Sequence, residues 1–372
     1  MQTSQMKKKV FFVLGNLRAG GSERVYWTLS QFLTKTKYDV SLIVLDSGDA
    51  FFSLDIKGVR VIQLNTIKAS KSFFKLYRLI KSEKPHAIFT TGGHINTLLA
   101  AVTIFAPVPV LIGREASFVE IMEKFDGPVD RFLNLFMRLS YKRMNFGICQ
   151  SEEIRNSLIK TYRIPEKKLV IIPNPVIPTE TIKEAESRTE KKMIYVGRLS
   201  AEKGPYRLLD VFRILPENYT LTIAGSGPLL PDLVQKVREA GLQNRVSFLG
   251  PVSNVVNVIA KHDITVLTSF TEGFPNVAIE SLSVGVPVVS FRVSGIAAII
   301  DNGFNGFVVE QDDLDAFARQ VMFACNKSWE AHAIKENVYS KFGVEKIAAS
   351  YNKIISPQGE FSENDEAALI YS

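Results

Sequence analysis

Residues 271–291 read T-E-G-F-P-N-V-A-I-E-S-L-S-V-G-V-P-V-V-S-F, and this stretch sets the pattern for the rest of the chain. The short apolar run at 263–267, just before it, predicts a buried strand. The Gly-Phe-Pro sequence interrupts that run. Apolar residues then predict a helix up to Gly285, and a second strand begins at 286–289. Strand, loop, helix and strand in this order indicate an α/β fold with a parallel sheet.

Two carboxylates lie in this stretch, Glu272 in the predicted loop and Glu280 in the predicted helix. Eight helical residues would separate them by about 12 Å along the axis, whereas a retaining hydrolase needs carboxyl groups about 5 Å apart. The spacing therefore predicts contacts with different parts of one extended ligand. The loop's backbone N–H groups and the helix N-terminus suit an anionic or hydroxyl-rich ligand. Taken alone, both residues fit solvated positions equally well.

The length and composition of the chain limit the classes of protein to which it can belong. A chain of 372 residues is long enough for two domains. No apolar run approaches the roughly 20 residues that cross a bilayer, and the N-terminus lacks a signal-peptide cleavage region. Cys149 and Cys325 lie far apart and form no metal-binding or redox pattern. We expect a cytoplasmic protein with reduced, buried thiols.

The net charge of +7 is unevenly distributed. Residues 1–178 contain 26 Lys and Arg against 14 Asp and Glu, and the remainder contains 19 against 24. The imbalance predicts two domains, the first of which favours an anionic surface or ligand. Because zinc-ligand spacing and RNA-binding aromatic signatures are missing, we expect no nucleic-acid partner.

The first half begins with a predicted strand at 9–14, a loop containing Gly20 and Gly21, and a helix that includes Arg24. Strand, glycine-rich loop and helix allow close approach to a phosphate. The loop lacks the G-x-G-x-x-G dinucleotide fingerprint, which disfavours a dehydrogenase. A tight turn alone explains the glycine pair equally well.

Alternating strands and helices continue to residue 355, and a proline-containing, polar linker is predicted at 171–192. Further strands are predicted at 40–45, 59–64, 87–90, 108–112, 146–150, 193–196, 221–224, 246–250 and 307–309. The last two helices are predicted at 313–325 and 342–355, and residues 356–372 are predicted to be disordered. These patterns predict two doubly wound parallel sheets, 1–178 and 179–340, facing a central cleft, with 341–355 packing back toward the first.

Polar residues follow two strands of the first half. His94 and Asn96 come after the strand at 87–90, and Arg114 and Glu115 come after the strand at 108–112. Ligands of such sheets bind at the carboxyl ends of the strands. These four residues are therefore candidates for contacting an acceptor, although a lone His is as often structural.

Two segments of the first half, 68–84 and 131–143, mix cations with apolar residues. The ordinary interpretation is an amphipathic helix that packs on the sheet. The alternative is peripheral contact with an anionic membrane through the apolar residues and the cations.

The second half begins with a strand at 193–196 and a loop that contains Arg198 and Lys203, and Pro205 then opens a helix. Two cations beside a helix N-terminus can bind a diphosphate, although solvated loop charges are the alternative. A second glycine turn, with Gly225 and Gly227, follows the strand at 221–224.

These pieces together resemble the retaining glycosyltransferases with the GT-B fold, family 4 or "group 1". The resemblance covers about residues 8–355. The matching pieces, in the family's order, are G-G-S-E-R (20–24), I-P-N-P-V (172–176), G-R-L-S-A-E-K-G (197–204), G-S-G-P (225–228) and E-G-F-P-N-V-A-I-E (272–280).

The resemblance implies a nucleotide-sugar donor, with UDP favoured, held mainly by the second domain. Arg198 and Lys203 would bind the diphosphate and Glu280 the ribose, while Glu272 would lie beside the transferred sugar. The remaining donor-binding residues would be Gly20, Gly21, Gly197, Gly225, Gly227, Gly273, Phe274, Pro275 and Asn276.

The resemblance also implies transfer of a hexosyl group, with retention, to a hydroxyl of a glycan or polyprenyl-diphosphate-linked oligosaccharide in surface-polysaccharide assembly. His94 falls where the family often places an acceptor-side histidine, and Arg24, Asn96, Arg114 and Glu115 are further acceptor-side candidates. Cations in place of a D-x-D motif at a strand end predict activity without a metal or other cofactor. The alternatives are a sugar-nucleotide epimerase of the same fold and a non-catalytic nucleotide-binding regulatory protein.

Overall fold

The computed structural model describes residues 7–18, 20–33, 38–48, 50–66, 69–115, 128–183 and 189–355. The chain forms two compact units. Unit 1 comprises Met1–Pro175 and Val344–Ser372, and unit 2 comprises Val176–Gly343. These divisions lie three residues from the expected ones at 178 and 340. The predicted tail at 356–372 lies outside the described residues.

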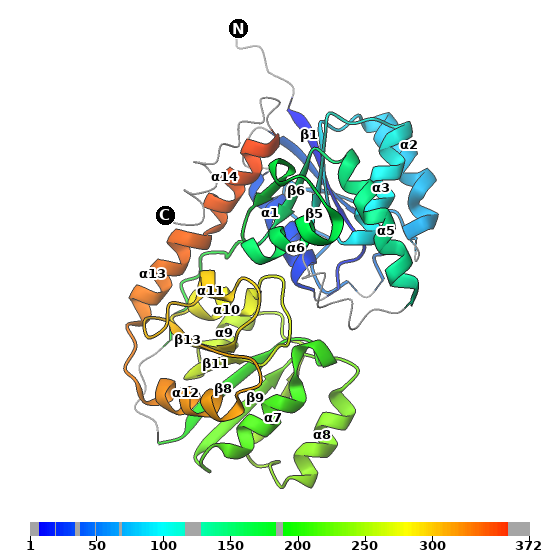
Figure 1. Cartoon of the computed structure of the whole chain (residues 1–372). Coiled ribbons are helices and arrows are strands. Elements are labelled where there is room, and N and C mark those ends of the chain that lie inside the picture. Colours follow the sequence, from blue (N-terminus) through cyan, green and yellow to red (C-terminus); the bar gives the residue numbers. More distant parts are fainter. Residues whose placement is uncertain are drawn as a thin grey trace. The chain divides into compact units, whose positions relative to one another are not determined.

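The sheet of unit 1 has seven parallel strands in the order β3-β2-β1-β4-β5-β6-β7 (Figure 1). Its strands are β1 (Lys8–Leu14), β2 (Tyr38–Val44), β3 (Arg60–Gln63), β4 (Ala87–Thr91), β5 (Val110–Arg114), β6 (Phe146–Cys149) and β7 (Leu169–Ile171). Central β1 pairs in register with both neighbours, Val10 lying opposite Val40 and Ala87. A strand buried on both faces requires an unbroken apolar sequence, which β1 has from Val10 to Leu14.

Helices cover both faces of this sheet. They are α1 (Gly21–Leu33), α2 (Phe73–Glu83), α3 (Gly93–Phe105), α5 (Pro128–Arg143), α6 (Glu152–Tyr162) and α14 (Val344–Ile355), with 3-10 turns η1 (Ala69–Ser72) and η2 (Glu166–Lys168). Alternate residues of β1 serve opposite faces. Phe12 packs in the core that includes α1 and α14, whereas Phe11 packs in the core that includes α2, α3 and α5.

The last helix, α14, belongs to unit 1 although it follows unit 2 in the sequence. It packs on α1. The Tyr351 ring lies 6.5 Å from Tyr26 and 5.2 Å from Phe89, measured between ring centroids. The expected helix at 342–355 is corrected at its start, because Phe342 ends a preceding helix, α13 (Ala331–Phe342), and Gly343 adopts extended backbone between the two.

Unit 2 contains six parallel strands in the order β10-β9-β8-β11-β12-β13. They are β8 (Lys191–Val196), β9 (Tyr219–Ala224), β10 (Val246–Gly250), β11 (Ile264–Leu267), β12 (Val288–Phe291) and β13 (Gly306–Val309). The surrounding elements are η3 (Ala201–Lys203), α7 (Pro205–Ile214), α8 (Leu230–Glu239), α9 (Val255–Ile259), α10 (Asn276–Leu282), α11 (Ile296–Ile299), α12 (Leu314–Asn326) and α13. The prediction of two doubly wound parallel α/β sheets is confirmed.

The predicted linker at 171–192 is too long at both ends, and its last two residues, Lys191 and Lys192, begin β8. Ile171 lies in β7, an edge strand that pairs with β6. Beyond it, the backbone N–H of Thr179 donates to Tyr339 Oη at 2.9 Å, and that of Lys183 donates to the carbonyl of Val284 at 2.7 Å. These residues are fixed to unit 2 by hydrogen bonds that a proline-rich, polar sequence does not reveal.

Candidate functional site

Two loops meet at the carboxyl edge of the unit 2 sheet. Strands β8 and β11 are neighbours in the sheet. The chain continues from β8 to β9 toward one edge strand and from β11 to β12 toward the other. Such a reversal of strand order is where open parallel sheets bind ligands. The loop at 197–204 follows β8, and the loop at 268–275 follows β11.

An ion pair joins the two loops. Lys203 Nζ lies 2.6 Å from Glu272 Oε2, and Ser269 Oγ donates to Glu272 Oε1 at 2.6 Å. The side chains of Lys203 and Glu272 are 25% and 13% exposed, so the pair is reachable from solvent yet partly shielded from it. Because the pair is partly shielded from water, its charges interact strongly with each other and with a charged ligand. Because it is reachable from solvent, such a ligand can replace one partner.

The backbone holds the loops in this arrangement. Gly204 adopts φ +62°, and a Cβ there would collide with the carbonyl oxygen of Thr268. Thr268 Oγ1 donates to the Gly204 carbonyl at 3.0 Å, and the Phe270 N–H donates to the Glu202 carbonyl at 2.8 Å. Only glycine combines the left-handed conformation with this close approach.

Tyr195 lies in the core of unit 2 and supports the loop at 197–204. It is buried, and its hydroxyl donates to the carbonyls of Arg198 at 3.2 Å and Lys203 at 3.5 Å. Burial raises the pKa of Tyr195, and the nearby carboxylates of Glu272 and Glu202 raise it further. The phenol therefore stays neutral and acts as a donor.

Glycines also determine how the β8 and β9 loops pack. Gly225 has φ +140°, and Cβ atoms at Gly225 and Gly227 would strike the backbone at Gly197 and Leu199. The Leu199 N–H donates to the Ser226 carbonyl at 2.9 Å. Arg198, between Gly197 and Leu199, has an exposed side chain. The predicted donor-binding glycines thus bring two loops together and leave Arg198 facing solvent.

The second glutamate and its neighbours lie at α10. Glu280 is in the middle of this helix and is 7% exposed. Pro275 is the N-cap residue, and Asn276 begins the helix. The Phe274 ring is buried and packs against Phe342 with centroids 5.6 Å apart.

In unit 1, His94 lies near the first glycine-rich loop. It is the second residue of α3, after β4, and a Cβ on Gly15 would lie 3.8 Å from His94 Nε2. Partial burial lowers the pKa of His94, so the ring is neutral at neutral pH. Gly20 precedes α1, which begins at Gly21 and carries Arg24 in its first turn.

The other acceptor-side candidates of unit 1 are buried. Arg114 is the last residue of β5 and only 1% exposed; its Nη2 donates to Asn174 Oδ1 at 2.5 Å. Asn96 is fully buried, and its Nδ2 donates to the Arg114 carbonyl at 3.3 Å. Glu115 is 7% exposed. In this conformation these three side chains face the interior of unit 1.

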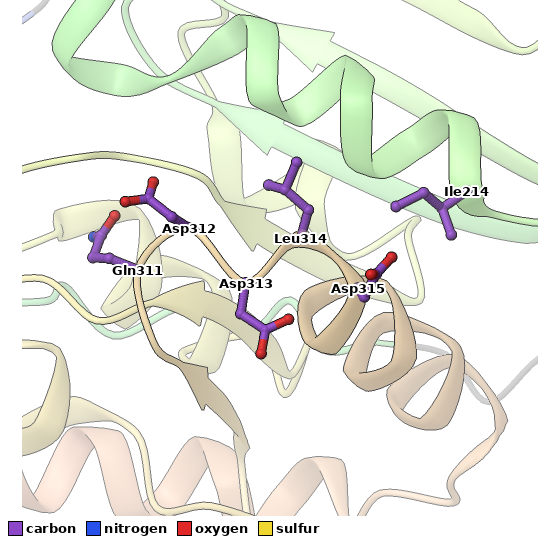
Figure 2. Close-up of a pocket in the computed structure, with 6 residues that line it drawn as sticks. All are labelled: Ile214, Gln311, Asp312, Asp313, Leu314 and Asp315. Carbon is purple, nitrogen blue, oxygen red and sulfur yellow. The ribbon is translucent and has the colours of Figure 1, made fainter.

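A surface pocket of unit 2 is lined by neither Lys203 nor Glu272. Figure 2 shows its lining, which comprises Ile214, Gln311, Asp312, Asp313, Leu314 and Asp315. Three carboxylates in this lining would repel a diphosphate, so the pocket is no candidate for the donor. Within the described ranges no three metal-ligating His, Cys, Asp or Glu side chains gather, and no helix is long and apolar enough to cross a membrane.

Sequence reasoning missed Tyr195, Ser269 and Arg207, which position the charged loops. Each is buried, and its partners are backbone carbonyls or side chains that no local sequence pattern marks. The one available signal was position, because Ser269 is the second residue after the strand that precedes Glu272.

Comparison with known proteins covers both units. The family described as "Glycosyltransferase Family 4" matches residues 19–180, and that described as "Glycosyl transferases group 1" matches residues 177–341.

Two curated relatives align over most of the chain. One, from Campylobacter jejuni, is a GalNAc-alpha-(1->4)-GalNAc-alpha-(1->3)-diNAcBac-PP-undecaprenol alpha-1,4-N-acetyl-D-galactosaminyltransferase; it is 28% identical over 86% of this chain and 89% of its own length. The other, from Escherichia coli, is a UDP-Gal:alpha-D-GlcNAc-diphosphoundecaprenol alpha-1,3-galactosyltransferase, 26% identical over 85% of this chain and 88% of its own length.

Among solved structures, Anabaena Alr3699/HepE in complex with UDP-glucose superposes with a TM-score of 0.77. The match covers 94% of this chain and 99% of that one at 17% sequence identity. At this identity the likeness concerns the fold alone.

Proposed function

Since the chain belongs to the GT-B glycosyltransferases of family 4, we propose that it transfers a hexosyl group from a UDP-sugar with retention of configuration and without a metal ion. The acceptor is a hydroxyl of a glycan or a polyprenyl-diphosphate-linked oligosaccharide in surface-polysaccharide assembly. The observation that carries the proposal is the Lys203–Glu272 pair, which places a cation and a carboxylate together where the unit 2 sheet reverses its strand order.

The relatives support the choice of substrates. The name of the Escherichia coli protein gives a UDP-sugar donor, and both names give acceptors linked to undecaprenol through a diphosphate. Both names also describe alpha-linked products. An alpha linkage is expected when the alpha-linked sugar of a nucleotide donor is transferred with retention.

Charge development in the transition state explains the two side chains. Breaking the bond between the anomeric carbon and the diphosphate leaves negative charge on the diphosphate and positive charge on the sugar. Lys203 and exposed Arg198 stabilise the leaving group, aided by the N-terminus of α7 that follows Gly204. Glu272 lies beside the sugar, and Glu280 binds the ribose hydroxyls. We assign His94, neutral at neutral pH, to the acceptor side.

We further propose that unit 1 contacts an anionic membrane through α2, α3 and α5, which Figure 1 shows side by side. We call this surface the basic apolar face. It comprises exposed Phe74, Ile104, Phe105 and Leu139 together with the cations Lys71, Lys75, Arg78, Lys81, Arg138, Lys142 and Arg143.

Contacts within unit 1 connect the members of this face. The Phe73 ring lies 5.4 Å from Phe74 and 6.1 Å from Phe105, and Arg143 Nη2 donates to the Thr103 carbonyl at 2.9 Å. Phe74 and Phe105 are 71% and 65% exposed. Residues 69–82, α3 and residues 136–143 contain no acidic residue. Exposed aromatic rings among cations and without acids suit anionic lipid headgroups.

The donor test uses purified protein with a panel of nucleotide sugars. A thermal-shift screen identifies the donor, because a bound ligand stabilises the folded state. UDP release is then measured with and without acceptor. Release that requires acceptor supports transfer, turnover of the UDP-sugar without acceptor indicates an epimerase, and binding without turnover indicates a regulatory protein. Loss of transfer in EDTA that magnesium restores contradicts metal independence.

The membrane test compares sedimentation with anionic and with zwitterionic vesicles at low salt. Phe105→Ser should weaken binding to anionic vesicles several-fold. Phe323→Ser, which removes an aromatic ring of similar exposure (57%) in unit 2, should not. Equal binding of wild type to both vesicle types, or no binding to either, contradicts the proposed face.

A further inference from the structure

The side chain of Arg207 connects three segments of unit 2. It is the third residue of α7, and although it is an arginine it is only 6% exposed. Burial lowers its pKa to about 10, which leaves the guanidinium charged at neutral pH. A buried charge is tolerated only where all its donors find acceptors.

Each nitrogen of Arg207 has an acceptor. Nε donates to the Thr268 carbonyl and Nη2 to the Ser269 carbonyl. Nη1 donates to Gln311 Oε1 at 2.7 Å and lies 3.5 Å from Asp312 Oδ1. Gln311 and Asp312 precede α12 at the pocket drawn in Figure 2. A planar guanidinium serves this divergent set of acceptors, whereas a lysine ammonium cannot.

Two aromatic rings fix the plane of the guanidinium. Its carbon lies 3.9 Å from the centroid of Phe270 and 4.1 Å from that of Phe291. Phe270 lies in the loop after β11, and Phe291 ends β12. Stacking on both rings restricts rotation of the group, so the two carbonyls it binds have fixed positions.

The loop held by Arg207 is the one that presents Glu272. Ser269 accepts from Arg207 through its carbonyl and donates through Oγ to Glu272 Oε1 at 2.6 Å. One residue therefore separates the buried cation from the carboxylate paired with Lys203. A displacement of the Ser269 backbone would move the carboxylate by a similar amount.

We infer that Arg207 is a positioning residue for glycosyl transfer, which fixes the Glu272 carboxylate through Thr268 and Ser269. This inference rests on the proposed role of Glu272. It predicts that weakening the Arg207 contacts slows the chemical step more than it weakens binding of the nucleotide, because misplacement of a reacting group by about 1 Å can cost 10²-fold in rate.

The test compares Arg207→Lys with a matched control, Arg245→Lys. Arg245 also donates to backbone carbonyls of unit 2, those of Tyr219, Leu215 and Pro216, and its guanidinium carbon lies 4.7 Å from the Phe212 ring centroid. Its partners lie outside the Glu272 loop. The measurements are kcat, the donor KM, the Kd of UDP by calorimetry and the thermal midpoint.

We expect Arg207→Lys to lower kcat at least tenfold while the donor KM and the Kd of UDP change less than threefold. Arg245→Lys should change kcat less than threefold, even if it lowers the thermal midpoint as much as Arg207→Lys does. Equal effects of the two variants on kcat would show that Arg207 is structural only and overturn the inference.

Ser269→Ala is a second variant that tests the same inference, and it can be used if Arg207→Lys fails to fold. It removes the hydrogen bond to Glu272 and should reproduce the loss of kcat. The double variant should be no slower than the slower single variant, because both changes break one connection. The inference is overturned if the double variant loses kcat by the product of the two single losses. It is also overturned if Ser269→Ala has a normal kcat.

Glu272→Gln separates failure of this inference from failure of the proposed function. Near-wild-type turnover in Glu272→Gln removes the role of Glu272 and the inference with it. An inactive Glu272→Gln beside a normal Arg207→Lys overturns the inference alone.

Discussion

The two units have the same central strand order, yet the loops at the point where that order reverses differ in charge. In unit 2 the loops after β8 and β11 bring Lys203 and Glu272 into an ion pair of 2.6 Å. In unit 1 the loops after β1 and β4 bring a neutral histidine, His94, next to Gly15. One sheet edge thus carries an ion pair, and the other carries a histidine that is neutral at neutral pH.

Lys203 and Arg114, one cation from each sheet edge, differ in exposure. Lys203 has a quarter of its side chain exposed, whereas Arg114, at the end of β5, is 1% exposed and is bound to Asn174 and Thr91. The comparison teaches that strand topology determines where a site can form, and that exposure of the charged groups determines what it can bind.

Lys203→Ala should have the largest effect. Loss of a cation that stabilises the leaving diphosphate should lower kcat about 10²- to 10³-fold, with the fold retained because Lys203 ends a surface turn. The assay is acceptor-dependent UDP release, with circular dichroism to check folding.

The control for this change is Lys183→Ala. Lys183 lies 3.8 Å from Asp263 at the opposite edge of the same sheet, and its side chain is 18% exposed. This variant should keep kcat within about threefold of wild type. Comparable losses of kcat in both variants would mean that the site does not lie at the carboxyl edge.

Gly204→Ala tests the backbone that presents Lys203. The left-handed φ of +62° alone should cost about 1 kcal/mol in a non-glycine residue, and the collision with the Thr268 carbonyl should add about 2 kcal/mol or more. Urea unfolding measures the loss.

Gly241→Ala is its matched control. Gly241 has φ +68°, and a Cβ at this position would meet no atom within 4 Å, so only the conformational strain should be seen. Equal losses in the two variants would refute the close approach of the two loops.

His94→Gln should have the smallest effect, and one that depends on pH. An unfolded His has a pKa of about 6.5, and burial lowers the pKa of His94 in the folded protein. Between these values the unfolded state binds more protons, so the free energy of unfolding falls as the pH falls through this window. Urea unfolding at pH 7.5 and 5.5 should show a smaller loss for His94→Gln than for wild type. An identical loss contradicts the burial of the ring.

Much of this molecule could be predicted from local sequence. Strands such as Val246–Gly250 and the loops with Lys203 and Glu272 follow from apolar runs interrupted by glycine and proline. Strand β7 was missed because its three residues, close to Pro173, are too few to show a periodic pattern. The accessibility of Arg114 was not predictable either, since its partner Asn174 lies 60 residues away. Buried polar contacts formed over such separations leave no local pattern in the sequence.

The order in which the chain is synthesised gives α14 a further significance. Ile347, Tyr351 and Ile354 of this helix lie in the core of unit 1, but they are translated after all of unit 2. Unit 2 is continuous in sequence, and its ends are joined by a hydrogen bond from the Val176 N–H to the Phe342 carbonyl at 2.8 Å. Domains of a nascent chain usually complete folding from the N-terminal one onward. Here the core of unit 1 lacks these side chains until unit 2 has been synthesised, so we expect unit 1 to complete its folding last.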